Sequence, residues 1–182
     1  ECYNYSPLIY APNCENIAIT GSGTLHGHGD KWWPWKYEKD RDRVTAASLP
    51  LEKRKFGLKN GVESQRPVLL MPWKSKNVLI EGVTLIDPPF WTVQPVYCEN
   101  VIIRGITINS RRGHNGDGID LDSCKNVLIE YNDLQTNDDA VCLKSGLNQE
   151  GMQIGIPCEN VVVRHFVARN VITGSGGIVI GS

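Results

Sequence analysis

Three aspartates precede apolar runs that are typical of buried strands. Asp138 and Asp139 open the run in TNDDAVCLKSG at 136–146, and Asp117 opens a similar one in NGDGIDLDS. Like charges repel, and a carboxylate beside a core is costly unless it is paired or takes part in chemistry. Carboxyl groups that meet at one surface can divide the roles of acid and base between them. The three can do so only if the fold brings them together.

A short sequence phrase that recurs five times predicts the strands that could bring the three aspartates together. It reads as a small residue, a polar residue and Asn, followed by alternating β-branched residues or Leu, which is typical of strands. The copies are CENIAI at 14–19, SKNVLI at 75–80, CENVII at 98–103, CKNVLI at 124–129 and CENVVV at 158–163. Repeats with periods in this range indicate stacked coils.

We therefore predict an all-β fold, a single-stranded right-handed parallel β-helix that forms one domain over 1–182. An antiparallel sandwich would give no reason for a fixed phrase at each strand start. Segment 29–66 breaks the rhythm and is predicted to be an inserted loop. Coils should stack about 4.8 Å apart. The repeat asparagines should then form a ladder of side-chain amides in one turn: Asn77, Asn100, Asn126 and Asn160.

The acids fall in one phase of this repeat. Aligning DGIDL at 117–121 with DAVCL at 139–143 puts Asp117 and Asp139 in one column on adjacent coils, with Asp138 one residue before. Ser175 has a similar phase on the next coil. Strict alternation would point Asp139 into the core, so we place Asp117 and Asp139 at the bend that enters each strand. Caps of turns are the alternative role for such acids. Three further carboxylates are predicted to be ordinary turn or surface groups: Asp120, Asp122 and Asp133.

The neighbouring charges also predict where a proton is held. Asp138 lies beside Asp139 and near Asp117, and ionised neighbours penalise a further negative charge. We therefore expect Asp138 to keep its proton and act as an acid, while Asp117 and Asp139 stay ionised and activate a water.

Four of the six cysteines share one position of the repeat. Cys14, Cys98, Cys124 and Cys158 each precede a repeat Asn by two residues, so they should form one column. Stacked neighbours point the same way and do not present their Cβ atoms as a disulfide requires. We predict buried free thiols. Zinc is disfavoured because no C-x-x-C pair is present, and the cysteines do not require an oxidising compartment.

The composition and charge of the chain limit the kinds of partner that it can bind. The net charge is −1 and the pI about 6.5, which gives no basic surface for nucleic acid. No apolar run approaches the length that would span a membrane. The first residues, ECYNYSPLIYAPN, have neither region of a signal peptide and so say nothing about export. We expect a monomer.

The predicted loop and the residues just before it carry two further groups that could do chemistry. Three tryptophans within four residues suggest a local core, and the alternative is that one of them, such as Trp33, lines a sugar subsite. His26, His28 and Asp30, in HGHGD, fit a Gly-rich turn better than a metal site. We expect neither metal nor cofactor.

Four segments together resemble the polygalacturonases, glycoside hydrolase family 28. They are RPVLLMPWKSKNVLIEGVTLIDPPFWTVQPVYCENV at 66–101, NGDGIDLDSCKNV at 115–127, NDDAVCLKSG at 137–146 and GSGGIVIGS at 174–182. The resemblance implies a secreted β-helical enzyme, extracellular or periplasmic, that hydrolyses α-linked galacturonic acid in pectin with inversion. An acid and a base that flank one glycosidic bond with room for a water suit that outcome.

The resemblance also implies roles for single residues. Asp138 matches the general acid of the family, and Asp117 with Asp139 matches the pair that activates the water. Lys144, Arg111 and Arg112 flank the acids and could draw a polyanion, although solvated surface charge is the plainer role for an arginine. The residues that we expect to bind the acidic polysaccharide are Asn115, His114, Lys144, Ser175, Gln94 and Trp33.

Departures from the family pattern leave other functions open. Gly116 stands where the N-T-D-G motif has Thr, and Ser175 stands where a G-H-G motif has a histidine that supports the acids. The family's Arg-x-Lys, which binds the substrate carboxylate, would lie beyond Ser182, so we expect a central fragment of a longer catalytic domain. The alternatives are a rhamnogalacturonan hydrolase and a catalytically weak carbohydrate-binding β-helix. A polysaccharide lyase would need calcium ligands and a basic residue that are not evident.

Overall fold

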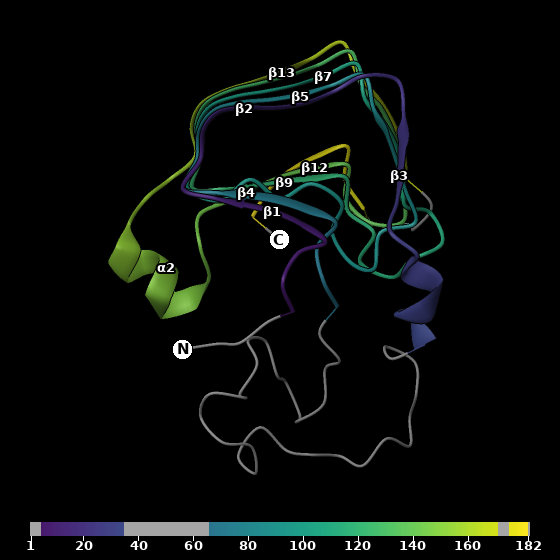
Figure 1. The fold of residues 1–182 in the computed structure, drawn as a ribbon. Helices are drawn as coiled ribbons and strands as arrows, with labels where there is room; N and C mark the ends of the chain where they lie inside the picture. Colours follow the sequence, from purple (N-terminus) through teal and green to yellow (C-terminus); the bar gives the residue numbers. More distant parts are fainter. Residues whose placement is uncertain (1–4, 35–65, 171–174, 182) are drawn as a thin grey trace.

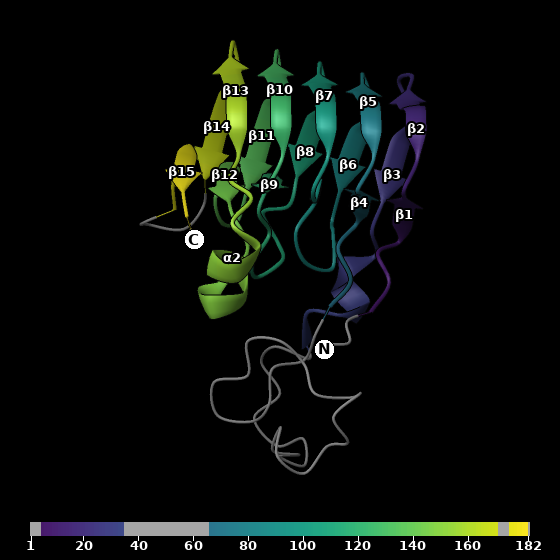
Figure 2. The same cartoon turned by 90° about the vertical axis from the view of Figure 1, so that its left-hand side faces the viewer.

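The computed structural model describes residues 5–34, 66–170 and 175–181, and its strands wind into stacked coils (Figures 1 and 2). Every strand pair is parallel. The predicted all-β parallel β-helix is thus confirmed. No helix in the described ranges is long and apolar enough to cross a membrane.

Three parallel sheets form the sides of the coils, and they account for nearly all of the regular structure. The first contains β2 (Glu15–Thr20), β5 (Lys76–Glu81), β7 (Glu99–Arg104), β10 (Lys125–Glu130) and β13 (Glu159–Arg164). The second contains β3 (Thr24–His26), β6 (Thr84–Ile86), β8 (Thr107–Asn109), β11 (Asp133–Thr136) and β14 (Val167–Asn170). The third side contains β9 (Ile119–Asp122), β12 (Val141–Lys144) and β15 (Ile178–Ile180), with the pair β1 (Ile9–Pro12) and β4 (Leu70–Trp73) in line with it.

The two helices whose bounds the structure describes are short and lie outside these sheets. The 3-10 helix η1 (Gly29–Lys31) follows β3, and α2 (Asn148–Ile154) lies between β12 and β13 (Figure 1). Of the predicted inserted loop at 29–66, residues 35–65 lie outside the described ranges, and Trp35 is among them.

The core consists of equivalent side chains that stack from coil to coil. Ile80 pairs in register with Ile103, and Ile103 with Ile129, and all three are fully buried. Each lies two residues after a buried Val of the same strand, so the repeat phrase points alternate residues inward as its period of two predicts. The apolar repeat therefore holds each coil on the next.

The predicted asparagine ladder is present and includes Asn16. Each amide donates to the oxygen of the Asn one coil earlier, over distances from 2.8 to 3.2 Å. Each Asn also has a positive φ between 52° and 57°, a left-handed conformation that Asn tolerates better than most residues. One residue type thus makes both the turn and the bond to its neighbour.

The cysteine column is confirmed for Cys98, Cys124 and Cys158, although Cys158, like Cys14, is only partly buried. The backbone N–H of Cys98 points at Sγ of Cys124, 3.4 Å away, and that of Cys124 at Sγ of Cys158, 3.5 Å away. Five cysteines are free thiols in the described ranges: Cys14, Cys98, Cys124, Cys142 and Cys158. Cys2 lies outside these ranges.

Substituting Asn100→Ala should weaken the ladder from both sides. The change removes the bonds to Asn77 and from Asn126, and places Ala in a left-handed turn that Asn accepts more easily. We expect a loss of about 1–2 kcal/mol in the free energy of unfolding, measured by chemical denaturation. Asn16→Ala is the matched control, because Asn16 has the same φ of 57° but only the bond from Asn77. Equal losses in the two variants would show that the ladder bonds contribute nothing.

Candidate active site

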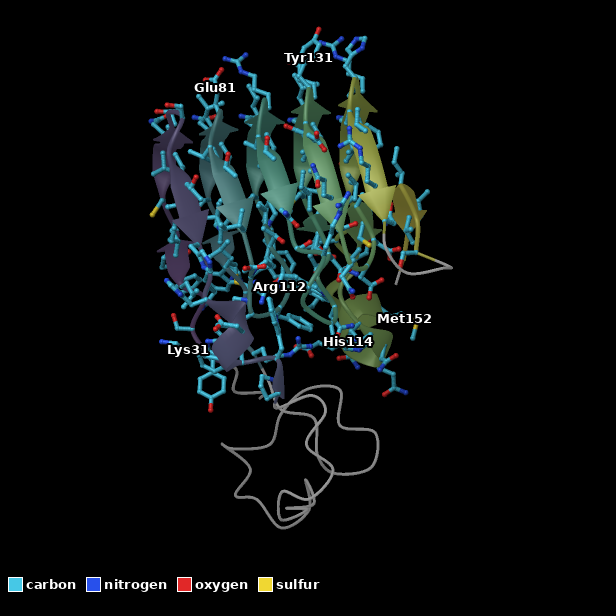
Figure 3. All side chains as sticks on the ribbon, turned by 90° about the vertical axis from the view of Figure 1, so that its right-hand side faces the viewer. Lys31, Glu81, Arg112, His114, Tyr131 and Met152 are labelled. Carbon is cyan, nitrogen blue, oxygen red and sulfur yellow. The ribbon has the colours of Figure 1, made fainter. Side chains whose placement is uncertain are left out.

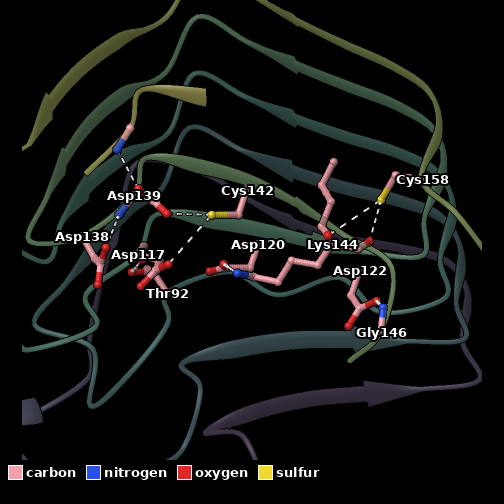
Figure 4. Close-up of polar contacts among 12 residues, drawn as sticks. Thr92, Asp117, Asp120, Asp122, Asp138, Asp139, Cys142, Lys144, Gly146 and Cys158 are labelled. Atoms are coloured by element: carbon pink, nitrogen blue, oxygen red, sulfur yellow. Dashed lines mark hydrogen bonds and ion pairs between the residues drawn. The ribbon is translucent and has the colours of Figure 1, made fainter. Parts of the chain in front are cut away.

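The three predicted carboxylates meet at one end of the third sheet (Figure 4). In the pairing of β9 with β12, Ile119 stands beside Val141, so Asp117 and Asp139 occupy equivalent places two residues before these strands. The N–H of Gly118 donates to the carbonyl oxygen of Asp139 at 2.9 Å, which continues the ladder into the bend. The predicted column is therefore confirmed, and the bend explains why Asp139 does not follow strict alternation.

Asp138 and Asp139 are half-buried and have different partners. Asp139 accepts the N–H of Gly176 on Oδ1 at 2.6 Å, and its Oδ2 lies 3.3 Å from the thiol of Cys142. Asp138 accepts the N–H of Asp139 and the hydroxyl of Ser175, and both contacts fall on its Oδ1, at 3.1 and 3.3 Å. The equivalent phase predicted for Ser175 thus brings it to the acids.

Asp117 is the most buried of the three, with 5% of its surface exposed. Its Oδ2 is 4.0 Å from Sγ of Cys142, and its Oδ1 has no hydrogen-bond partner among the described residues. Burial raises the pKa of Asp117 to about 9, with further upward contributions from the charges of Asp120 and Asp138 and an opposing one from Lys144. A carboxyl group in this position keeps its proton at neutral pH.

This result corrects the predicted ionised state of Asp117, while the proton expected on Asp138 stays a prediction. The sequence left Asp117 ionised, because it showed only the spacing of like charges. Burial is the larger cause at Asp117, and it depends on which side chains cover a group and not on its neighbours in the chain. The carboxyl cluster therefore holds a proton at Asp117.

Asp120 was predicted to be an ordinary turn or surface group, and this prediction is wrong. It is fully buried on β9, where its Oδ1 forms an ion pair of 3.3 Å with Nζ of Lys144 (Figure 4). Burial raises the pKa of Asp120 to about 7 against the lowering effect of Lys144. The missed signal was the alignment of DGIDL with DAVCL, which also places Asp120 beside Cys142.

Asp122 and Asp133 agree better with their predicted roles as turn or surface groups. Asp122 accepts the N–H of Gly146 at 2.8 Å and so holds the turn after β12. Asp133 is partly exposed and pairs with Arg169.

The predicted substrate-binding residues divide into two groups. Near the acids lie Ser175, Lys144 and Gln94, the last of which stands next to Asp120 in register. Lys144 is buried and already paired, so its charge is not free for a polyanion in the way that the sequence suggested. His114 and Asn115 lie on a turn held by Arg66, which donates to the carbonyl oxygen of His114 and to Oδ1 of Asn115.

The arginines that follow β8 differ in their contacts. Both are exposed, and Arg112 also donates to Asp87 at 3.0 Å. Figure 3 shows Arg112 and His114 on the loops between Lys31 of η1 and Met152 of α2.

Trp33 does not offer a face to a sugar. It is 8% exposed, its indole N–H donates to the carbonyl oxygen of Pro88 at 3.0 Å, and the guanidinium of Arg112 lies 5.3 Å from its ring centroid. The local-core interpretation is therefore the right one for this ring. The aromatic residue beside the acids is Trp91, half-buried, with Nζ of Lys144 4.6 Å from its ring centroid. Its place one coil before Asp117 could have been found from the repeat.

The structure explains one departure from the family motif. A side chain at Gly116 would collide with the carbonyl oxygens of Ser110 and Gly113, so Thr does not fit in this turn. The hydroxyl of Ser110 donates to the carbonyl oxygen of Gly116 at 2.5 Å and fixes the approach of the chain to Asp117.

One group of side chains has the composition of a metal site. Oxygens of Asp117 and Asp139 and the sulfur of Cys142 lie within 4.8 Å of one another and could together hold an ion. The same three atoms make contacts between a thiol and two carboxyls without one. The imidazoles of His26 and His28 stack on each other, with centroids 4.3 Å apart, in the Gly-rich segment before η1.

Comparisons with known proteins agree with this fold. The model of the family described as "Glycosyl hydrolases family 28" matches residues 53–182. A probable polygalacturonase from Vitis vinifera is 34% identical over 164 residues, which cover 89% of this chain and 29% of that protein. A hyperthermoactive exopolygalacturonase from Thermotoga maritima has a crystal structure that superimposes with a TM-score of 0.82, at 41% identity, over 100% of this chain and 44% of that one. The polygalacturonase from Erwinia carotovora, 24% identical with a TM-score of 0.63 over 96% of this chain and 45% of its own, agrees in fold.

Stability should depend on pH through Asp117. Its pKa is raised to about 9 from an ordinary value of 3.8, so the folded chain binds this proton more tightly than the unfolded one. The stabilisation is complete below about pH 4 and is lost as the pH rises through about 9. Asp117→Asn removes the titrating group and should flatten this decline. The Tm of the variant, relative to the unsubstituted protein, should rise steadily between pH 4 and pH 9 in thermal unfolding.

Asp133→Asn is the control, because Asp133 is a partly exposed carboxylate paired with Arg169. The Tm of Asp133→Asn, relative to that of the unsubstituted protein, should not rise between pH 4 and pH 9. Parallel pH profiles for Asp117→Asn and the unsubstituted protein would contradict a retained proton at Asp117.

Proposed function

Since this chain belongs to the glycosyl hydrolases of family 28, we propose that the protein hydrolyses α-glycosidic bonds of galacturonic acid in pectic polysaccharide. The chain spans less than a third of the Vitis vinifera relative and under half of the Thermotoga maritima structure, so the activity of the whole protein is an inference. The observation that carries it is the cluster of Asp117, Asp138 and Asp139 at one end of the third sheet.

Hydrolysis of a glycosidic bond needs one group that gives a proton to the leaving oxygen and another that takes a proton from water. Asp138 is suited to the first role, because its carboxyl is half-buried and both of its described contacts fall on one oxygen. Asp117 is too enclosed to reach a polymer chain directly, with only 5% of its surface exposed. We assign the general acid to Asp138.

Asp117 and Asp139 are suited to activating the water. Both approach the same thiol, that of Cys142, so they act at one point. The proton held at Asp117 does not prevent this role, because one proton between two carboxyl groups still leaves one carboxylate to accept a proton from water. A water that attacks from the face opposite the leaving oxygen gives inversion.

The substrate class follows from the relatives and from the residues around the cluster. The names of the compared proteins give polygalacturonase and exopolygalacturonase activities. Trp91 provides a half-buried aromatic face beside the acids, of the kind that packs against sugar C–H groups. His114, Asn115, Ser175 and Gln94 remain candidates for contacts with the polymer. We propose that the protein acts outside the cytoplasm, in the extracellular space or the periplasm, because a pectic polymer is encountered there.

A second function, binding of carbohydrate without turnover, is favoured by one observation. Ser175 stands where the family motif has a histidine, although its hydroxyl still contacts Asp138 at 3.3 Å. A serine hydroxyl cannot carry the positive charge that a histidine can. Direct measurement of turnover by the unsubstituted protein separates the two functions.

Asp138→Asn should abolish hydrolysis by removing the transferable proton while keeping the shape of the side chain. We expect turnover of polygalacturonan to fall by a factor of about 10² or more. An aryl galacturonide with a leaving group that needs no proton should lose far less. Asp133→Asn, a carboxylate paired with Arg169 on the second sheet, should keep turnover of both substrates. Near-normal turnover of polygalacturonan by Asp138→Asn would mean that Asp138 is not the acid.

Substrate preference should follow charge and sugar identity. Polygalacturonan should be cleaved faster than rhamnogalacturonan, and a neutral glucan not at all, when new reducing ends are counted at equal polymer mass. Faster cleavage of rhamnogalacturonan would assign the protein to the alternative hydrolase activity. Turnover of the neutral glucan at the rate of polygalacturonan would exclude a pectic substrate.

A further inference from the structure

We propose that Cys142 is a positioning residue of the active site, whose thiol hydrogen links the two carboxyl groups that activate the water. This inference rests on the proposed hydrolytic function and adds to it a residue outside the acids themselves. Sγ of Cys142 lies 3.3 Å from Oδ2 of Asp139 and 4.0 Å from Oδ2 of Asp117 (Figure 4). The thiol therefore lies between oxygens that belong to different coils.

The fold explains this position. Cys142 stands in β12 beside Asp120 of β9, and its neighbours Val141 and Leu143 share the register of Ile119 and Leu121. Because side chains alternate along a strand, Cys142 points to the opposite side from Val141 and toward the acids. It is nevertheless 0% exposed. A thiol held in this way cannot turn to solvent, so its hydrogen has carboxyl oxygens as its acceptors.

The thiol also stays protonated. Burial raises the pKa of Cys142 well above its ordinary value, as does the charge of Asp120, while Lys144 opposes this. The contacts with Asp139 and Asp117 act in the same direction as Asp120. These four residues are the charged groups that face Cys142 from β9, β12 and the bends before them. A protonated thiol is a weak donor and not a nucleophile.

The other thiols of the chain make different contacts. Sγ of Cys98 lies 3.4 Å from the carbonyl oxygens of Pro72 and Val96, and that of Cys124 lies 3.3 Å from the carbonyl oxygen of Pro95. Among the five cysteines of the described ranges, only Cys142 has a described contact with a carboxyl group. Cys98, equally enclosed, is therefore a matched control.

The thiol has a direct consequence for the carboxyl pair. Two carboxyl groups at this distance repel each other once both are ionised, and a donor shared between them offsets part of that repulsion. It also fixes the two oxygens relative to the bend, which sets where a water can bind. Because Cys142 touches the acids and not the sugar, its loss should affect the chemical step and leave substrate binding unchanged.

The test compares Cys142→Ala, Cys142→Ser and Cys98→Ala in kcat and KM for polygalacturonan across pH. Cys142→Ala should lower kcat about tenfold with KM within twofold of normal, and should move the acid limb of the kcat/KM profile to higher pH, because the one carboxylate of the pair has lost a donor. Cys142→Ser keeps a donor and should recover most of both changes. Cys98→Ala should keep the normal profile. Normal kcat and a normal acid limb in Cys142→Ala, or no recovery in Cys142→Ser, would overturn the proposal.

A second measurement does not depend on turnover and so separates this inference from the proposed function. The thiol offers a donor to the one carboxylate that the pair keeps when Asp117 is protonated, so its removal should cost more Tm at pH 8, where the pair carries this charge, than at pH 4. Cys158→Ala should cost the same Tm at both values, because the pKa of the Cys158 thiol is raised by burial and its contacts are with the carbonyl oxygens of Leu121 and Lys144. If the unsubstituted protein hydrolyses no pectic polymer, the proposed function fails, and the Tm comparison still decides the role of Cys142. An equal loss of Tm at the two pH values would overturn that role.

Discussion

The coils of this β-helix stack in strict register, because each repeat Asn takes a left-handed turn and bonds to the Asn of the coil before it. Register in a parallel stack decides which side chains become neighbours, since a slip of one residue would exchange the inward and outward faces of a strand. Asp117, Asp139 and Gly176 meet for this reason, although about 60 positions of the sequence separate the first from the last. The chemistry of the site is therefore a consequence of the ladder.

Much of this arrangement could be predicted from the repeat. The spacing of the phrase gave the parallel coils, the ladder through Asn77 and Asn160, and the thiol column that contains Cys124. The alignment of DGIDL with DAVCL gave the column of Asp117 and Asp139. These features depend only on the position of a residue within the repeat, and that position can be counted along the chain.

What could not be predicted depends on which side chain covers another. The alignment places Asp120 beside Cys142, but it does not show that Lys144 of the next coil closes over Asp120 and buries it. Asp117 was expected to stay ionised, but burial raises its pKa to about 9. Trp33 was a candidate for a sugar subsite, but its indole N–H donates to the carbonyl oxygen of Pro88. Desolvation is a property of the assembled coils, so periodicity alone does not reveal it.

Helix α2 shows how such a fold can vary. The coil that contains it has 34 residues between Asn126 and Asn160, whereas the coil before it has 26 between Asn100 and Asn126. The additional residues project from the stack at one corner, between β12 and β13 (Figure 1). The ladder bond across this coil, from the amide of Asn160 to Oδ1 of Asn126, is still 3.1 Å long. Insertions at a corner therefore leave the columns undisturbed. Evolution can lengthen or shorten such corners, and so reshape what surrounds the acids, without an accompanying change in the residues that carry out the reaction.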